Sequence, residues 1–359
     1  MVVSKGKIIF LLPTISIVPV GGYKIVMQYA NKMAEDGYDV TIAYAGFIWR
    51  FFKNKSLKEK CGYIKSIFYN KKKYSARNWF PLDKRINETH PLLLTFKRSL
   101  DADIYIATAC LTAKYIAQYP DNRKKIYFIQ GYESWDMNDE ELNKTYSLPL
   151  ERIVISKWLQ ELLNKKGYSS TLITNGFNSR EFYLTIPIEK KSRNKISLLY
   201  HPDPLKGFPL ALKALSIVHQ QYDIEVEVFG SQLPAIPLPS WISFHLTPTS
   251  DKHLQINNEC AIYVAASYSE GWGLTIGEAM MCGQAVVCTD NKGYLEMVKN
   301  GYNALVTSIG NANGLAQSII CLISNNQLRC QIAHCGFETI KQFDFEISYT
   351  KLKKIIHSS

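Results

Sequence analysis

The residues best suited to chemistry are two glutamates on either side of a short glycine loop, Glu270 and Glu278. Gly271 and Gly273 lie between them, and the apolar run 260–266, of strand type, precedes the loop. After Gly273 the apolar residues recur at helical spacing. The pattern predicts a strand, a loop and a helix whose N-terminal N–H groups can bind a phosphate or diphosphate.

The two carboxylates need a different kind of partner, because like charges repel and a carboxylate is a poor phosphate ligand. Glu270 and Glu278 are eight positions apart, so both can face one ligand. They are suited to bind hydroxyls, such as those of a ribose or a hexose. The stretch therefore predicts a nucleotide-sugar site. The alternative is an ordinary strand-to-helix turn, with glycines for conformation and glutamates for the helix dipole.

Residues 267–283 resemble the Glu-x7-Glu signature of retaining glycosyltransferases with the GT-B fold, the large family 4. The similarity continues through 284–290, 293–296 and 300–306. It implies an α/β protein of two doubly wound Rossmann-like domains that face a cleft. It also implies retaining transfer of a glycosyl group from a nucleotide sugar. Neither a cofactor nor a metal is implied, since the nucleotide sugar is a substrate.

The resemblance assigns roles to single residues. Glu270 would bind hydroxyls of the transferred sugar and Glu278 the ribose, while Lys206 and the loop amides would stabilise the leaving diphosphate. Lys206 matches the lysine of the family's diphosphate segment. Five positions earlier, where the family has an arginine, this chain has His201, which is only partly charged at neutral pH.

A second glycine loop lies near the N-terminus. The apolar run 7–12 predicts a buried strand, and 23–36 a helix that ends at Gly37. Gly21 and Gly22 lie between them and resemble the family's Gly-Gly loop beside the reacting sugar and the acceptor.

Further acceptor-side candidates follow the predicted strand 125–130, where ligands bind in open parallel sheets. Gln130 stands near the place where many relatives have a histidine, and a glutamine cannot titrate. Glu133 is a candidate for acceptor binding or, equally, for a helix-start carboxylate.

The catalytic candidates are Glu270 and Lys206; the donor-binding candidates are Gly22, His201, Lys206, Ser231, Glu270, Gly271, Gly273, Leu274, Thr275 and Glu278; the acceptor-side candidates are Gly21, Tyr23, Gln130 and Glu133.

Two domains are expected. Residues 1–180 form an acceptor-side Rossmann-like domain onto which 340–359 packs back, and 190–340 form the nucleotide-sugar domain. Asn175-Gly176 and the polar run 189–195 mark the linker. Asp101 and Asp103 match a metal motif of another glycosyltransferase fold, but they are better explained as the polar start of a buried strand.

Composition sets further limits. The 359 residues are 47% hydrophobic and 20% charged, which is typical of a globular protein, and no apolar run approaches the ~20 residues of a membrane span. The eight cysteines include no Cys-x-x-Cys pair, which favours reduced core cysteines in a cytoplasmic protein.

The net charge of +11 is concentrated in the N-terminal half, where 53–73 holds eight lysines and one acid. Such a segment suits anionic lipid at the inner face of a membrane, a polyanionic acceptor or nucleic acid. A solvated loop without a specific partner explains it equally well. The chain lacks helix-turn-helix, RNA-recognition and zinc signatures, so no nucleic-acid partner is expected. A catalytically weak partner subunit that binds a nucleotide sugar or stabilises another glycosyltransferase remains the alternative function, because of His201 and Gln130.

Overall fold

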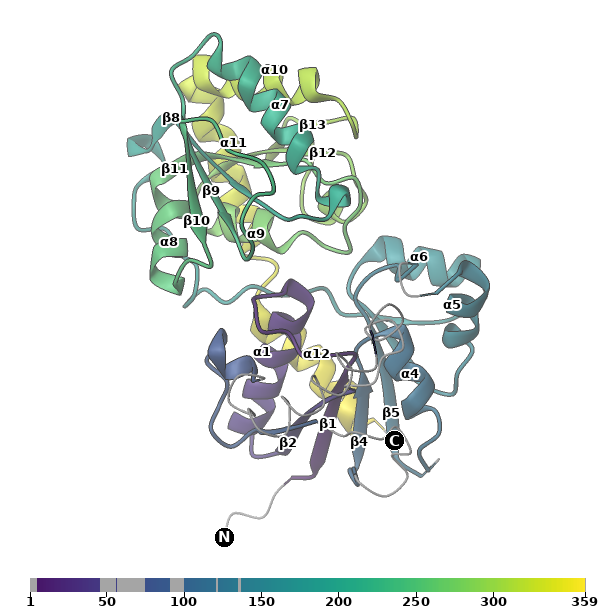
Figure 1. Cartoon of the computed structure of the whole chain (residues 1–359). Helices are drawn as coiled ribbons and strands as arrows, with labels where there is room; N and C mark the ends of the chain where they lie inside the picture. The colour runs from purple at the N-terminus through teal and green to yellow at the C-terminus, as the bar shows by residue number, and fades with distance from the viewer. Residues whose placement is uncertain are drawn as a thin grey trace. The chain divides into compact units, whose positions relative to one another are not determined.

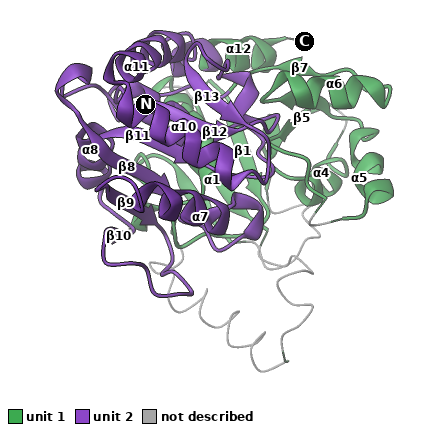
Figure 2. Ribbon diagram, turned by 90° about the horizontal axis from the view of Figure 1, so that it is seen from above, with its two compact units in different colours: residues 1–174, 349–359 green, residues 175–348 purple. Residues whose placement is uncertain are grey.

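The computed structural model describes residues 5–45, 56, 75–90, 100–120, 122–134 and 137–358. The chain divides into two compact units, residues 1–174 with 349–359, and residues 175–348 (Figures 1 and 2). Each unit contains one parallel β-sheet with helices in the connections, which confirms the predicted doubly wound α/β class. No helix within the described ranges is long and apolar enough to cross a membrane. The basic segment 53–73 lies outside the described residues, apart from Ser56.

Unit 1 is built on a seven-stranded sheet. Its elements are β1 (Lys7–Leu12), α1 (Gly21–Glu35), β2 (Asp39–Tyr44), η1 (Ala76–Asn78), β3 (Asn87–Thr89), β4 (Ile104–Ala107), α4 (Cys110–Ile116), β5 (Lys124–Ile129), α5 (Asp139–Tyr146), β6 (Glu151–Val154), α6 (Lys157–Lys165) and β7 (Thr171–Leu172). The strand order is β3-β2-β1-β4-β5-β6-β7, and all pairs are parallel. The chain order reverses between β1 and β4, and the loops at the carboxyl ends of such strands are where ligands bind.

Unit 2 repeats the plan with six strands. Its elements are η2 (Ile188–Lys190), β8 (Ser192–Leu199), η3 (Pro204–Lys206), α7 (Phe208–His219), β9 (Glu225–Gly230), β10 (Ile242–Leu246), α8 (Ser250–Glu259), β11 (Cys260–Ala265), α9 (Leu274–Met281), β12 (Ala285–Thr289), η4 (Tyr294–Glu296), β13 (Ala304–Thr307), α10 (Ala312–Ser324) and α11 (Asn326–Ile340). The strand order is β10-β9-β8-β11-β12-β13, so the reversal lies between β8 and β11. Its core comes from alternate strand residues and the apolar faces of α7 and α10.

The predicted linker 189–195 is partly wrong, because β8 already begins at Ser192. The first residues of this strand are exposed, and Lys195 pairs with Glu225 of β9 at 3.1 Å. Polar residues therefore occupy the solvated end of a strand whose later residues, such as Ile196, are buried.

The last helix, α12 (Phe345–His357), begins in unit 2 and from Tyr349 onward belongs to unit 1. Tyr349 donates a hydrogen bond to Asp36 at 2.9 Å, and the Lys353 ammonium reaches the same carboxylate at 2.6 Å. Tyr38 and His357 are joined by a further hydrogen bond of 2.9 Å. The predicted return of the C-terminal helix to the first domain is confirmed.

A chain of buried polar side chains crosses the sheet of unit 2. The Ser197 hydroxyl of β8 donates to the Gln284 side-chain oxygen at 2.7 Å, and the Gln284 amide donates to Asn257 of α8 at 2.7 Å. Next to Asn257, the buried Lys191 ammonium donates to the backbone carbonyl oxygens of Asn257, Asn258 and Cys260. Every member is almost fully buried, so these bonds replace water.

Candidate active site

The predicted strand, glycine loop and helix are present as β11, residues 266–273 and α9. Gly273 precedes α9 with φ of 112°, and a Cβ atom there would lie 2.7 Å from the ring of Tyr294. Both the backbone conformation and the close contact require glycine at this position. The loop therefore turns sharply into the N-terminus of α9, with Leu274 and Thr275 in the first turn.

Glu270 is held within this loop by two side chains. Its carboxylate accepts a hydrogen bond from Ser267 at 2.9 Å and pairs with the Lys206 ammonium at 2.8 Å. Tyr294 in turn donates to the Ser267 hydroxyl at 2.8 Å. The Glu270 side chain is 16% exposed and that of Lys206 30%, so the pair is accessible from one side. The two catalytic candidates are thus brought into direct contact.

Lys206 reaches Glu270 because its turn rests on the loop. The hydrogen bond from Leu205 N to the Asp203 carboxylate, at 2.9 Å, starts η3. Gly207 ends it with φ of 68°, and a Cβ there would lie 2.0 Å from the carbonyl oxygen of Ala266. Tyr268 N then donates to Leu205 O at 2.8 Å. Backbone thus packs directly on backbone, which only glycine permits.

His201 follows β8 directly, where the family's arginine is expected. Its Nδ1 accepts a hydrogen bond from Asp203 N at 3.1 Å. Burial, and secondly the positive charge of Lys206, lower the pKa of His201 below its ordinary value. The imidazole is therefore mainly neutral at pH 7 and does not supply the permanent charge of an arginine. Ser231, partly exposed, comes directly after the neighbouring strand β9.

Glu278 lies in α9 and is 6% exposed. The buried Tyr263 of β11 connects the two glutamates: burial raises the pKa of its hydroxyl, Thr275 is its hydrogen-bonding neighbour, and the charges of Glu278 and Glu270 add to the rise. The charges of both carboxylates therefore act on one buried side chain. Gly271, half-buried, lies in the same loop.

Unit 1 brings three of its acceptor-side candidates together with Gly22. Gly21 and Gly22 open α1, and a Cβ on Gly22 would lie 3.2 Å from the side-chain oxygen of Gln130. This buried Gln130 oxygen has no hydrogen-bond partner among the described residues. Tyr23 accepts a hydrogen bond from Thr14 N at 3.3 Å. Gly22 and Gln130 are therefore neighbours near the carboxyl ends of β1 and β5.

Glu133 has a different environment. It is 5% exposed, and its carboxylate accepts a hydrogen bond from the backbone N–H of Cys110 at the start of α4. A carboxylate at this place stabilises the helix N-terminus. The contact fits the helix-start alternative for Glu133, although the helix is α4 and not one that follows Glu133.

Sequence reasoning missed the residues that support the donor loop. Thr289, the last residue of β12, and Asn291, two residues later, both donate to Ser267 O, at 2.6 and 3.1 Å. Gly293 lets the η4 turn pack closely on the donor loop, since a Cβ at Gly293 would lie 2.5 Å from Glu270 O. The available signal was position, because both residues lie at the carboxyl end of β12, the strand that pairs with β11.

The two aspartates with metal-motif spacing have a structural partner. Arg123 pairs with Asp103 at 2.8 Å and with Asp101 at 3.1 Å. Within the described part of the chain, no three His, Cys, Asp or Glu residues are arranged to hold a metal ion.

Comparisons with known proteins agree with this geometry. Residues 186–338, nearly the whole of unit 2, match the family described as "Glycosyl transferases group 1". An N,N'-diacetylbacillosaminyl-diphospho-undecaprenol alpha-1,3-N-acetylgalactosaminyltransferase of Campylobacter jejuni is 30% identical over 102 residues, 28% of this chain and 27% of that protein. A phosphatidyl-myo-inositol mannosyltransferase of Mycolicibacterium smegmatis is 22% identical over 219 residues, 57% of this chain and 56% of that protein. The matched regions thus span between about a quarter and about half of these two relatives.

The fold of the whole chain is matched by a solved structure. Anabaena HepE in complex with UDP and glucose superposes with a TM-score of 0.74 at 16% sequence identity, covering 99% of this chain and 100% of that one. The chain therefore has the GT-B fold, with two parallel sheets of seven and six strands. Its second unit, over residues 186–338, is similar to the glycosyl transferases group 1 family.

Proposed function

We propose that the protein transfers a glycosyl group from a nucleotide sugar, with retention and without a metal, to a glycan, lipid-linked or surface-polymer acceptor. The contact between Lys206 and Glu270 carries this proposal. It places an ammonium suited to a diphosphate beside a carboxylate suited to sugar hydroxyls. Both lie at the carboxyl ends of β8 and β11, where the strand order of unit 2 reverses.

In this proposal the departing diphosphate is the main charge to be stabilised. Lys206 and the N-terminal amides of α9, from Gly273 to Thr275, oppose that charge as the anomeric C–O bond breaks. Glu270 orients the sugar hydroxyls and Glu278 the ribose. Neutral His201 offers hydrogen bonds in place of a second cation, and Ser231 lies on the side of the base.

The acceptor part of the proposal rests on unit 1 and on the names of relatives. Gly22 lies against Gln130, and the nearby Gly21 and Tyr23 complete the proposed acceptor side, where amide and hydroxyl groups can bind hydroxyls. The Campylobacter relative is named for a diphospho-undecaprenol compound and the Mycolicibacterium relative for phosphatidyl-myo-inositol. Both names favour a lipid or lipid-linked acceptor, and we propose that the protein reaches it at the cytoplasmic face of a membrane. Flotation with anionic and neutral vesicles would test this, and equal or no binding would contradict it.

A screen of UDP-, GDP- and dTDP-sugars by thermal shift and hydrolysis, with and without EDTA, tests the donor side. One donor should stabilise the protein and be slowly hydrolysed regardless of EDTA. Lys206→Ala and Glu278→Gln should then reduce transfer severely, whereas Lys213→Ala, at an exposed lysine of α7, should not. Near-wild-type transfer by either site variant would remove that residue from the proposed site.

The second candidate is a catalytically weak partner subunit. The lowered pKa of His201 favours it, because a neutral imidazole opposes diphosphate charge less than an arginine. Donor binding without hydrolysis, even with a competent acceptor, would support this candidate.

A further inference from the structure

The chain passes between the two units twice, near residues 174–175 and 348–349, and the adjoining segments of unit 2 are joined to each other. Phe177 N donates to Phe343 O at 2.7 Å, and Phe345 N donates to Phe177 O at 3.1 Å. Gly176 allows this approach, since a Cβ there would lie 2.4 Å from the Phe345 Cα. We call residues 176–177 with 343–345 the brace.

The brace contacts α9 beside one of the two glutamates. A Cβ on Gly277 would lie 2.0 Å from Cζ of Phe177, so the ring rests directly on the bare backbone of the helix. Gly277 immediately precedes Glu278 in the sequence. Phe177 is itself 6% exposed. The ring of Phe177 therefore contacts α9 at the residue next to Glu278.

The brace also contacts the loop of the other glutamate. The rings of Trp272 and Phe343 meet edge to face, with centroids 5.4 Å apart and planes at 71°. Trp272 is 3% exposed and lies two residues after Glu270. One backbone-linked pair of segments thus supports the neighbours of both carboxylates.

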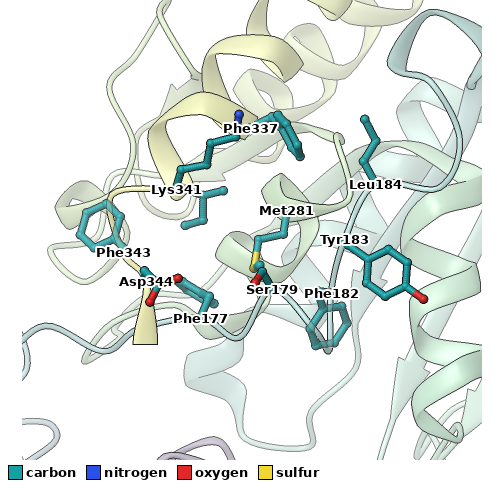
Figure 3. A pocket seen from close by; sticks show the side chains of 11 residues that line it. Phe177, Ser179, Phe182, Tyr183, Leu184, Met281, Phe337, Lys341, Phe343 and Asp344 are labelled. Atoms are coloured by element: carbon teal, nitrogen blue, oxygen red, sulfur yellow. The ribbon is translucent and has the colours of Figure 1, made fainter. Parts of the chain in front are cut away.

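The brace also borders a pocket of about 190 Å³ (Figure 3). Phe177, Phe343 and Met281, the last residue of α9, line it together. Removal of the Phe177 ring would enlarge this pocket, because the neighbouring side chains would not fill the space that the ring occupied. The contact with Gly277 would then be lost without compensation.

We propose that Phe177, together with the Trp272–Phe343 contact, is a positioning element that holds Glu278 and Glu270 in the geometry needed to bind the donor nucleotide. This inference rests on the proposed function and deepens it. None of the three aromatic side chains needs to touch the donor. They act through the backbone of α9 and of its preceding loop.

A double-mutant cycle tests the proposal, with titration of UDP, GDP and dTDP as the probes. Phe177→Ala should weaken the best nucleotide about tenfold in the wild-type background and less than about threefold in a Glu278→Ala background, because the contribution of Glu278 is already lost. Phe177→Leu should retain most of the affinity. Gly277→Ala, which drives a methyl group into the ring, should weaken binding like Phe177→Ala.

The matched control is Phe182→Ala, which removes a buried phenylalanine of the same segment whose ring is not among the atoms nearest to Gly277. It should lower the thermal stability comparably and leave the affinity within about twofold. Equal losses of affinity in Phe177→Ala and Phe182→Ala would overturn the proposal. So would an undiminished effect of Phe177→Ala in the Glu278→Ala background.

Amide hydrogen exchange without nucleotide separates this inference from the proposed function. Phe177→Ala should speed exchange in residues 270–281 more than Phe182→Ala does. If no nucleotide binds the wild-type protein, the proposed function fails and the exchange experiment alone decides whether the brace holds the loop and α9. Unchanged exchange in 270–281 would refute the brace.

Discussion

Gly207→Ala is the most direct perturbation of the contact between Lys206 and Glu270. Gly207 has φ of 68°, and its added Cβ would lie 2.0 Å from the Ala266 carbonyl oxygen. Since real contacts of this kind need more than 3 Å, the η3 turn must withdraw from the donor loop. The withdrawal would break the 2.8 Å hydrogen bond from Tyr268 N to Leu205 O and separate Lys206 from Glu270.

The loss of unfolding free energy expected for Gly207→Ala has two parts. An alanine in the left-handed region is less favourable than glycine by roughly 1 kcal/mol, whatever surrounds it. Forced displacement of packed backbone adds about 1–3 kcal/mol. Gly301→Ala isolates the first part, because Gly301 has φ of 72° and its Cβ would meet no atom within 4 Å.

Urea unfolding and nucleotide titration of both variants provide the assay. Gly207→Ala should lose about 2–4 kcal/mol of unfolding free energy and most of its nucleotide affinity. Gly301→Ala should lose about 1 kcal/mol and bind normally. If the two variants are equally stable and bind equally well, the backbone contact between η3 and the loop does not position Lys206, and the reasoning is wrong.

Three further predictions concern burial and ion pairs. Burial lowers the pKa of Lys191 to about 8. Between pH 8 and pH 10.5, the ordinary pKa of a lysine, the unfolded chain binds more protons than the folded protein. The unfolding free energy of the wild-type protein should therefore rise with pH, relative to that of Lys191→Met, by at most about 1.4 kcal/mol per pH unit. Parallel stability curves of the two proteins over pH 8–10 would contradict this. Trp272→Phe should be nearly neutral, because the buried indole N–H has no hydrogen-bond partner among the described residues, whereas Trp272→Ala should cost about 3–5 kcal/mol in thermal or urea unfolding. The hydrogen bond from Lys353 lowers the pKa of Asp36, so the carboxylate stabilises the fold above its ordinary value of 3.8 and less as the pH falls through the lowered pKa. Asp36→Asn should therefore speed proteolysis of 349–357 at pH 7, and its deficit in thermal stability should shrink below about pH 4; a deficit independent of pH would speak against the ion pair.

The sequence predicted the parts of the fold that local patterns determine. The buried runs that became β1 and β11 contain little but apolar residues, and glycines mark the turns after them. Helices α5 and α8 were missed, because their sequences, DEELNKTY and SDKHLQINNE, are almost entirely polar. They are fixed instead by capping at Asn138 and Thr249 and by a few buried residues such as Leu142.

The candidate site divides in the same way. Glu270, Glu278 and Lys206 could be proposed from spacing and resemblance, because each lies in a short motif. The contact of Glu133 with Cys110 joins residues 23 positions apart, and that of Lys206 with Glu270 joins residues 64 positions apart. No local pattern encodes such distances, so these partners emerged only from the folded chain.

The buried chain of Ser197, Gln284 and Asn257 bears on the register of strands. The pairing of β8 with β11 shifts between Cys260 and Ile262, and a parallel pair with such an irregularity has competing alignments. A slip by one residue would move the carboxyl end of β8 by about 3.3 Å and turn its side chains to the opposite face. It would also bury Ser197 without a partner, and this penalty selects the native alignment. The hydrogen bonds of Ser197, four residues before His201, thereby fix the position at which the chain leaves β8 towards His201 and Lys206.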